Sequence, residues 1–237
     1  MNKLVEGYKL QIYLARHAES EGNIPRSEIT GGGPGEERAR HDPDLTPLGV
    51  RQAKLLAKRL SGERFDAIFA SPLLRAARTA RAVAAAQPGE KIKITFLREL
   101  REAGTPWSYD GSDGRELGQV CRGYAGELVS LLPGTDWEAL EASDRDAAHL
   151  ERAYVCARYF RETFFTGERI FVVAHGTFNT YLIRALLEMG NEQDFNFCQE
   201  NTGLTKVKYF IDSGRRLSYA NDTSHLYACA PGLSFSL

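Results

Sequence analysis

The sequence lacks an excess of charge of either sign. Its 237 residues include 30 lysines and arginines against 31 aspartates and glutamates, a net charge of −1, which disfavours binding to nucleic acid through overall charge. It also lacks an apolar run of about 18 residues, which would indicate a membrane span, and residues 1–10 contain no apolar stretch typical of a secretion signal. We therefore expect a cytoplasmic protein without nucleic-acid or membrane partners.

Cysteine is scarce, and no histidine pair has metal-ligand spacing. The four cysteines lie far apart and form no CxxC pair, which predicts buried, reduced thiols rather than disulfides; they are Cys121, Cys156, Cys198 and Cys229. The five histidines form neither HxxH nor HxxxH, so we expect no metal site and no cofactor.

Hydrophobic residues make up 43% of the chain and follow an alternation of strands and helices. Strands are predicted at 8–15, 65–70, 91–96, 169–174, 205–211 and 217–221, and helices at 47–60, 72–86, 145–166 and 178–189. This order predicts an α/β fold of three layers, α/β/α, with a mainly parallel central sheet.

A single domain over residues 1–237 is predicted, with two insertions at about 20–44 and 104–144. The first is rich in Gly, Pro and charge, and the second shows at most short helices. We expect these insertions to select the substrate.

Two helix starts can be predicted from local signals. Thr46 is expected to be the N-cap of the first helix, with Pro47 at its first position and Val50 on its apolar face. Ser71 is expected to cap the second helix.

Charged and imidazole side chains follow the predicted strands at their carboxyl ends. Arg16 and His17 follow the first strand, Arg75 lies one helical turn after the second, and His175 follows the strand at 169–174. The carboxyl ends of parallel strands meet at one edge of the sheet, where ligands bind. The sequence therefore predicts two histidines and two arginines around one anionic ligand.

A phosphoryl group is the anion that these residue types suit best. Arginine presents a planar fork of donors that matches phosphate oxygens. A neutral imidazole can attack phosphorus to form a phosphohistidine, and a second histidine, if protonated, would stabilise the charge of the transition state. The constellation predicts phosphoryl transfer without a metal ion.

A carboxylic acid would complete this chemistry. It would protonate the leaving oxygen and then deprotonate the water that hydrolyses the intermediate. Two candidates follow the third predicted strand, Glu99 and Glu102. The pattern of residues alone leaves the choice between them open.

Four segments together resemble the motifs of the histidine phosphatase superfamily, whose fold is also called phosphoglycerate mutase-like. They are LARHAESEGN at 14–23, LTPLGVRQA at 45–53, ASPLLRAARTA at 70–80 and VAHG at 173–176. They occur in the family's order, and the resemblance covers about residues 8–226. The family's usual Arg-His-Gly appears here as Arg-His-Ala, a frequent variant that leaves the nucleophile in place.

The resemblance implies a role for each matching residue. His17 would be the phosphate-accepting nucleophile, and Arg16, Arg75 and His175 would form the phosphate pocket. Asn23 would contact the substrate. The family usually carries Leu-x-Glu after the third strand, and resemblance favours Glu102 over Glu99 as the general acid.

The predicted function is hydrolysis of a small phosphorylated substrate, a phosphomonoester, with release of inorganic phosphate. One alternative is a phosphoglycerate-type phosphomutase, which is disfavoured because the Phe-Thr-Gly-Trp segment of glycolytic mutases is replaced at 24–28 by IPRSE. The other is a non-catalytic protein that binds a phospholigand. No heptad pattern or obvious edge-pairing strand indicates an oligomer.

Overall fold

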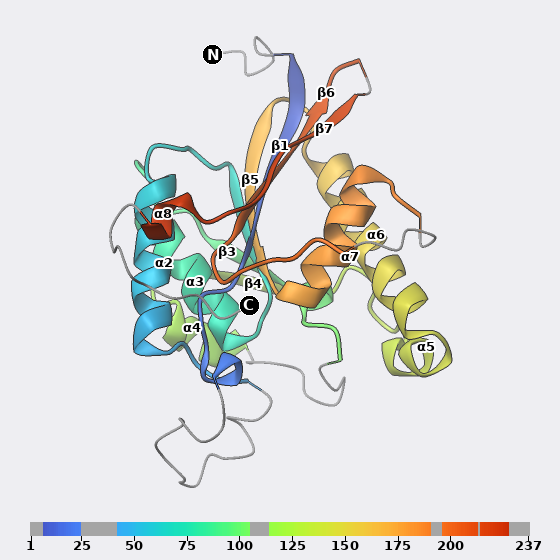
Figure 1. Cartoon of the computed structure of the whole chain (residues 1–237), viewed down its shortest axis with the longest axis horizontal. Coiled ribbons are helices and arrows are strands. Elements are labelled where there is room, and N and C mark those ends of the chain that lie inside the picture. The colour runs from blue at the N-terminus through green and yellow to red at the C-terminus, as the bar shows by residue number, and fades with distance from the viewer. Residues whose placement is uncertain (1–6, 25–41, 105–113, 191–195, 213, 228–237) are drawn as a thin grey trace, which may run out of the picture.

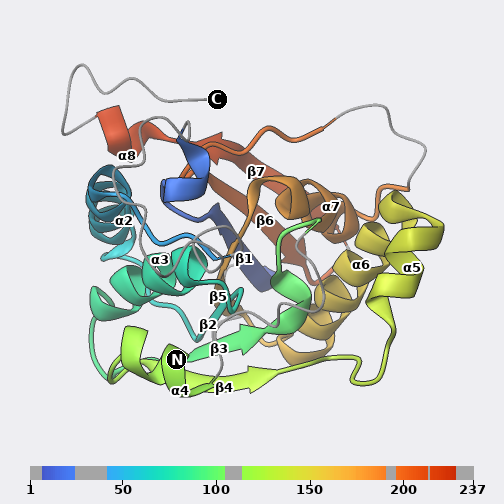
Figure 2. The same ribbon diagram turned by 90° about the horizontal axis from the view of Figure 1, so that it is seen from below.

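A mixed sheet lies at the centre of the computed structural model, which describes residues 7–24, 42–104, 114–190, 196–212 and 214–227. Its strands are β1 (Tyr8–Arg16), β2 (Ala67–Ala70), β3 (Ile94–Leu97), β4 (Ala125–Val129), β5 (Glu168–Ala174), β6 (Leu204–Phe210) and β7 (Arg215–Asp222). Their order is β4-β3-β2-β5-β1-β6-β7 (Figure 2). The first five strands in this order are parallel, and β6 and β7 are antiparallel, which confirms the mainly parallel sheet.

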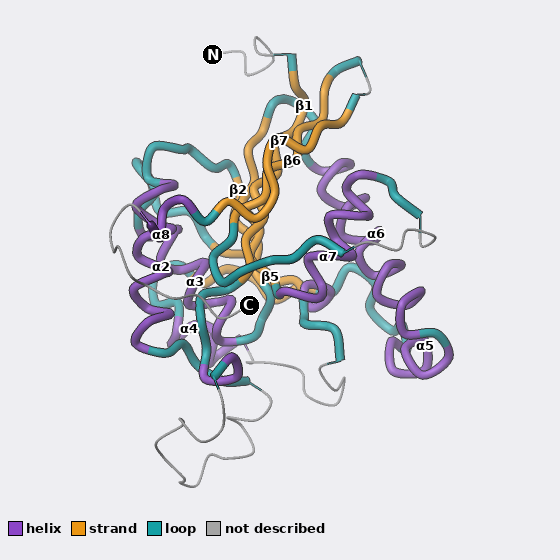
Figure 3. Tube along the Cα trace, in the orientation of Figure 1, coloured by secondary structure: helices purple, strands orange, loops and turns teal. Residues whose placement is uncertain are grey.

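Helices cover both faces of the sheet (Figures 1 and 3). They are the short 3₁₀ helices η2 (Glu21–Asn23) and η4 (Arg98–Leu100), and the α-helices α2 (Pro47–Leu60), α3 (Leu74–Ala85), α4 (Gly114–Val120), α5 (Trp137–Ser143), α6 (Arg145–Thr163), α7 (Gly176–Leu187) and α8 (Ser224–Tyr227). One layer contains α2, α3, α4 and α8, and the other contains α5, α6 and α7 (Figure 1). The predicted three-layer class is confirmed. None of the described helices combines the length and apolar character that crossing a membrane requires.

Each face of the sheet has its own hydrophobic core. On β1, Ile12 and Leu14 pack into the core beneath α6 and α7, whereas Tyr13 and Ala15 pack beneath α2 and α3. Successive side chains of a strand point to opposite faces, so a strand in the middle of the sheet is buried on both sides. Full burial of one side chain of leucine size contributes about 1.5–3 kcal/mol. The two cores hold the strand ends in place.

The strand register places the polar strand ends side by side. Arg16 of β1 is paired with Ala174 of β5, so the next residues along both strands, His17 and His175, are neighbours. Ala70 of β2 is paired with Val173 of β5, which brings Ser71 to the same edge. The sheet itself therefore assembles the site.

The predicted insertion at 104–144 contains a strand that the sequence analysis missed. Besides the short helices α4 and α5, it contributes β4, which pairs in parallel with β3 at the edge of the sheet. A Cβ atom at Gly126 would lie 2.8 Å from the carbonyl oxygen of Ile94, so close pairing here requires glycine. The glycine and the largely exposed edge position remove the apolar alternation that marks a strand.

The predicted start of α2 is confirmed, and its predicted apolar face is wrong only at Val50, since Ala53, Leu56, Ala57 and Leu60 are buried. Thr46 Oγ1 accepts a hydrogen bond from the Gly49 N–H at 2.9 Å, and Pro47 is the first helical residue. Val50 is 41% exposed, contrary to prediction. Gly49 is buried against the backbone of Glu19, which leaves no room for a side chain, because a Cβ atom there would lie 1.9 Å from the Glu19 carbonyl oxygen.

The predicted cap of the next helix is wrong. The helix α3 begins at Leu74 rather than Pro72, and Ser71 lies outside its first turn. The Leu74 N–H instead donates to the Asp42 carboxylate at 2.8 Å. Asp42 follows residues 25–41 of the first predicted insertion, which lie outside the described residues. A side chain distant in sequence thus caps this helix, and the helix N-terminus favours its negative charge.

We expect Thr46→Ala to lower the free energy of unfolding by about 1–2 kcal/mol, because the substitution removes a helix cap. It also removes the hydrogen bond that the Thr46 hydroxyl donates to Glu19 Oε1 at 2.6 Å. Urea unfolding of both proteins measures the difference. Ser61→Ala, at the exposed end of the same helix, is the matched control and should change stability by less than about 0.5 kcal/mol. Equal effects would contradict this account of the α2 start.

Candidate active site

His17 is buried at the end of β1, with 3% of its surface exposed. Its Nδ1 lies 2.7 Å from the carbonyl oxygen of Ala18. Since a carbonyl oxygen only accepts hydrogen bonds, Nδ1 must carry the proton. Arg75 Nε donates to the other ring nitrogen, Nε2, at 3.3 Å. Both contacts select the same neutral tautomer, with the lone pair on Nε2.

The electrostatic surroundings keep the His17 ring neutral. Burial lowers its pKa well below the usual value, and the positive charges of Arg75 and Arg16 lower it further. The hydrogen bond to Ala18 opposes this shift only in part. Near neutral pH, Nε2 therefore has an unprotonated lone pair.

His175 is also fully buried, and its ring centroid lies 5.1 Å from that of His17. Its Nε2 lies 2.8 Å from the Ser71 hydroxyl, which already accepts a hydrogen bond from the Leu73 N–H at 3.3 Å. The hydroxyl hydrogen is free to be donated to Nε2, and in that tautomer the ring proton lies on Nδ1. Within the described residues, Nδ1 has no hydrogen-bond partner.

The charge of His175 differs from the protonated state considered in the sequence analysis. Burial lowers the pKa of His175 well below its usual value, and Arg75, the neighbouring His17 and Arg16 lower it further. Both imidazoles are consequently neutral near neutral pH in the ligand-free site. A neutral ring still has one N–H to donate.

Arg16 and Arg75 lie beside the two histidines, as predicted. An Nη atom of Arg16 donates to the carbonyl oxygen of Gln199 at 2.8 Å, while its Nε has no partner within the described residues. A Cβ atom at Gly176 would lie 3.3 Å from this Nε, so glycine permits the close approach. Arg75 also lies 3.8 Å from Asp42.

The structure brings Glu102, rather than Glu99, to the site. One oxygen of Glu102 accepts from the N–H groups of Ala103 at 2.8 Å and Phe178 at 3.0 Å, and the other lies 3.4 Å from the Thr177 N–H. The carboxylate therefore lies at the N-terminus of α7, which begins directly after His175.

Glu99 lies elsewhere and is fully buried. Its Oε1 accepts hydrogen bonds from the Ser130 hydroxyl at 2.8 Å and from the N–H groups of Leu131 and Leu132 at 2.8 and 3.3 Å. These contacts tie η4 to the segment after β4. Glu99 thus serves the packing of the fold.

The side-chain oxygen of Asn23 is used within the protein. It accepts from the Ser20 N–H at 3.0 Å, from the Ser20 hydroxyl at 3.1 Å and from Asn201 Nδ2 at 3.4 Å. Asn201 also donates to the carbonyl oxygen of His17 at 3.0 Å. Asn23 is therefore linked to the backbone of His17, and its contact with a substrate stays a prediction.

Several supporting residues were missed from the sequence. Asn201 and Thr202 contact the backbone of His17, and Thr79 accepts from the Ala18 N–H at 3.0 Å while donating to the Arg75 carbonyl at 2.7 Å. Only Thr79 carried a signal, because it lies one helical turn after Arg75 inside a recognised motif. Asn201 and Thr202 belong to no motif.

A cavity of about 630 Å³ adjoins the site at Arg16, Glu102 and Gly176. Its other lining residues come from the start of α6, from α7 and from the segment before β6; they are Asp146, Thr177, Thr180, Tyr181, Asn196, Phe197, Cys198, Gln199 and Glu200. None of the described residues of the two predicted insertions lines it.

The thiols only partly follow the prediction. Cys121 and Cys156 are buried, but Cys198 is exposed on the wall of the cavity. Cys229 lies outside the described residues.

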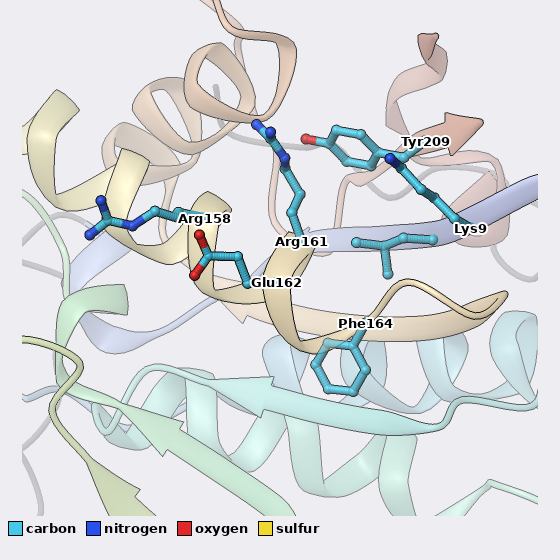
Figure 4. Close-up of a pocket in the computed structure, with 7 residues that line it drawn as sticks. Lys9, Arg158, Arg161, Glu162, Phe164 and Tyr209 are labelled. Atoms are coloured by element: carbon cyan, nitrogen blue, oxygen red, sulfur yellow. The ribbon is translucent and has the colours of Figure 1, made fainter. Parts of the chain in front are cut away.

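A second, smaller pocket of about 140 Å³ lies at the opposite end of β1. Its basic side chains, Lys9, Arg158 and Arg161, come from β1 and α6 (Figure 4). Lys9 is eight residues before His17 on an extended strand, a separation of roughly 26 Å. This pocket is therefore not part of the site.

Two neutral histidines and two arginines at the carboxyl edge of a parallel sheet define an α/β enzyme that handles phosphoryl groups. Residues 12–223 match the family model described as "Histidine phosphatase superfamily (branch 1)". The chain belongs to the histidine phosphatase superfamily. The predicted family and the predicted class of enzyme, a phosphatase, are confirmed.

Both phosphatases and mutases are similar to this chain. "Probable phosphoglycerate mutase GpmB" of Serratia proteamaculans is 29% identical over 234 residues, covering 92% of this chain and 95% of the relative. Phosphoserine phosphatase 1 of Hydrogenobacter thermophilus is 43% identical over 91 residues, covering 38% of this chain and 39% of the relative. A phosphoserine phosphatase mutant from Entamoeba histolytica, solved with phosphoserine, has the same fold, with a TM-score of 0.57, 24% identity and coverage of 92% and 99%.

We expect stability to fall as the pH drops from 7 to 5, because buried histidines remain neutral in the folded state. Burial lowers the pKa of His225, which lies 3.0 Å from Thr202, to about 4. The unfolded chain therefore binds a proton at this histidine below about pH 6.5, whereas the folded protein does so only below about pH 4. By pH 5 this difference lowers the free energy of unfolding by about 2 kcal/mol.

The variant His225→Gln tests this expectation, because glutamine does not titrate. Urea unfolding at pH 7 and pH 5 should show a loss of stability in the variant that is smaller by about 2 kcal/mol than in the wild type. Identical losses in the two proteins would show that His225 is not a source of the acid sensitivity.

Proposed function

We propose that the protein hydrolyses phosphomonoesters through a phosphohistidine on His17, without a metal ion. The observation that carries this proposal is the tautomer of His17. Its Nδ1 proton is held by the Ala18 carbonyl, and its Nε2 lone pair lies beside Arg75. A neutral, oriented imidazole nitrogen next to a guanidinium group is what attack on a phosphoryl group requires.

In the first step, His17 Nε2 forms a bond to phosphorus while the bond from phosphorus to the leaving oxygen breaks. Arg16 and Arg75 bind the phosphoryl oxygens, and the unpartnered Nδ1–H of His175 donates to another. Glu102 gives a proton to the leaving oxygen. In the second step, Glu102 takes a proton from a water molecule, which attacks phosphorus and releases inorganic phosphate from His17.

The charge of the cavity supports hydrolysis over a mutase reaction. Its described lining includes three carboxylates, Glu102, Asp146 and Glu200, and one cation, Arg16. Arg16 is engaged by the first phosphate in this proposal, so the charges left for a second phosphate among the described lining residues are negative. We infer that the leaving group is a small polar alcohol with an uncharged or cationic substituent rather than a second phosphate.

We expect the wild type to release phosphate from 4-nitrophenyl phosphate in the presence of EDTA, and His17→Ala to lower kcat by at least about 10³-fold, because it removes the nucleophile. Acid-labile, alkali-stable phosphate on the denatured wild type would identify the phosphohistidine. Turnover that survives in His17→Ala would exclude His17 as the nucleophile.

The same preparation distinguishes the alternative functions. Interconversion of phosphoglycerates without net phosphate release would identify a mutase. Binding of inorganic phosphate by a wild type that turns over no phosphate ester would identify a non-catalytic binding protein.

We expect Glu102→Gln to lower kcat/KM for phenyl phosphate by about 10²–10⁴-fold, because phenoxide must be protonated as it leaves. The loss should be much smaller for 4-nitrophenyl phosphate, whose leaving group needs little protonation. Glu99→Gln is the matched control, since an amide oxygen can still accept the three hydrogen bonds at 130–132. A larger loss of activity in Glu99→Gln than in Glu102→Gln would reverse the assignment.

A further inference from the structure

An arginine that no motif includes lies behind the carboxylate of Glu102. Arg152, on α6, is 1% exposed. One of its Nη atoms donates to the backbone carbonyl of Arg101 at 2.9 Å, and the other lies 3.3 Å from His149 Nδ1. Burial lowers the pKa of His149 to about 4, so its ring is neutral near neutral pH, and the same Nδ1 lies 3.3 Å from the Glu141 carboxylate.

The guanidinium of Arg152 contacts both structures that hold Glu102 in place. Arg101, whose carbonyl it binds, is the residue directly before Glu102. On its other side, the guanidinium carbon lies 4.3 Å from the ring centroid of Phe178, a cation–π distance. The N–H of Phe178 is one of the two backbone donors to Glu102 Oε1, at 3.0 Å. One side chain thus joins the chain segment of Glu102 to the helix that binds its carboxylate.

Charge acts in the same direction as these contacts. Burial lowers the pKa of Arg152 to about 10, with Glu141 and Glu102 among the charges that oppose this shift. The side chain therefore remains a cation near neutral pH and attracts the Glu102 carboxylate. A buried cation is retained at a considerable cost in desolvation, which a leucine or methionine at this position would avoid.

We propose that Arg152 is the positioning residue for Glu102, holding its carboxylate at the α7 N-terminus where it can exchange a proton with the leaving oxygen and with water. This inference rests on the proposed function, because it assigns a reason for a step in that reaction. Arg152 is not among the residues that line the cavity. Its charge is also among those that lower the pKa of His175, after the charges of Arg75, His17 and Arg16.

The test compares aryl phosphates that differ in how much protonation their leaving group needs. Arg152→Met should lower kcat/KM for phenyl phosphate by about 10–100-fold and for 4-nitrophenyl phosphate by less than about 3-fold, because only the first requires a well-placed proton donor. Arg158→Met is the matched control: Arg158 lies on the same helix, is exposed and faces the remote pocket of Figure 4. It should leave both rates unchanged.

A double-mutant cycle separates positioning from a purely structural role. Because Arg152 acts through Glu102, adding Arg152→Met to Glu102→Gln should cost less than about 2-fold beyond Glu102→Gln alone. If the methionine variant fails to fold, Arg152→Lys replaces it in the same double-mutant cycle with Glu102→Gln. This substitution keeps the charge but loses the planar contact with Phe178.

The outcomes are distinct. Equal losses for both aryl phosphates, or losses that add fully to those of Glu102→Gln, would overturn the positioning role and leave Arg152 as a structural residue. An unchanged Arg152→Met enzyme would overturn it as well. A wild type that hydrolyses no aryl phosphate would instead contradict the proposed function itself.

Discussion

The hydrogen bond between His17 Nδ1 and the carbonyl oxygen of Ala18 is the interaction on which the site depends. It fixes one tautomer, and the burial of the ring keeps that tautomer neutral beside two arginines. The geometry of this bond requires the chain to turn just after β1. The turn is held by Thr79, which binds the Ala18 N–H, and by Asn201, which binds the His17 carbonyl. Residues from α3 and from the segment before β6 thus hold the backbone that orients the His17 ring.

The N-terminus of α7 organises the other half of the site. His175 is its N-cap, Gly176 makes room for Arg16, and the next two N–H groups face the carboxylate of Glu102. A negative charge is favourable at this position because the backbone N–H groups there have no partners within the helix. The candidate nucleophile and the candidate acid are therefore set by different elements, β1 and α7, which meet only because β1 and β5 are paired.

Much of this arrangement could be predicted from local patterns. The apolar alternation predicted the parallel sheet, and the polar residues that follow its strands predicted which side chains would meet. The strand β4 was missed because Gly126 and the exposed edge position remove the apolar alternation that identifies strands. Ser71 was misassigned as a helix cap, because its hydroxyl is bound by a histidine 104 positions away. No local signal contains such a partner.

The sequence by itself determined the family and the fold class, and it predicted that His17, Arg16, Arg75 and His175 would lie together, because motifs at strand ends are short and contiguous. Only the tertiary structure shows that Glu102, and not Glu99, lies at the site. Both occur in the same Leu-Arg-Glu context three residues apart, and they differ only in what surrounds them. One faces the N-terminus of α7 and the other is enclosed by the segment at 130–132. Because the two tripeptides are identical, the local sequence cannot distinguish the two glutamates. Contacts with elements distant in sequence distinguish them.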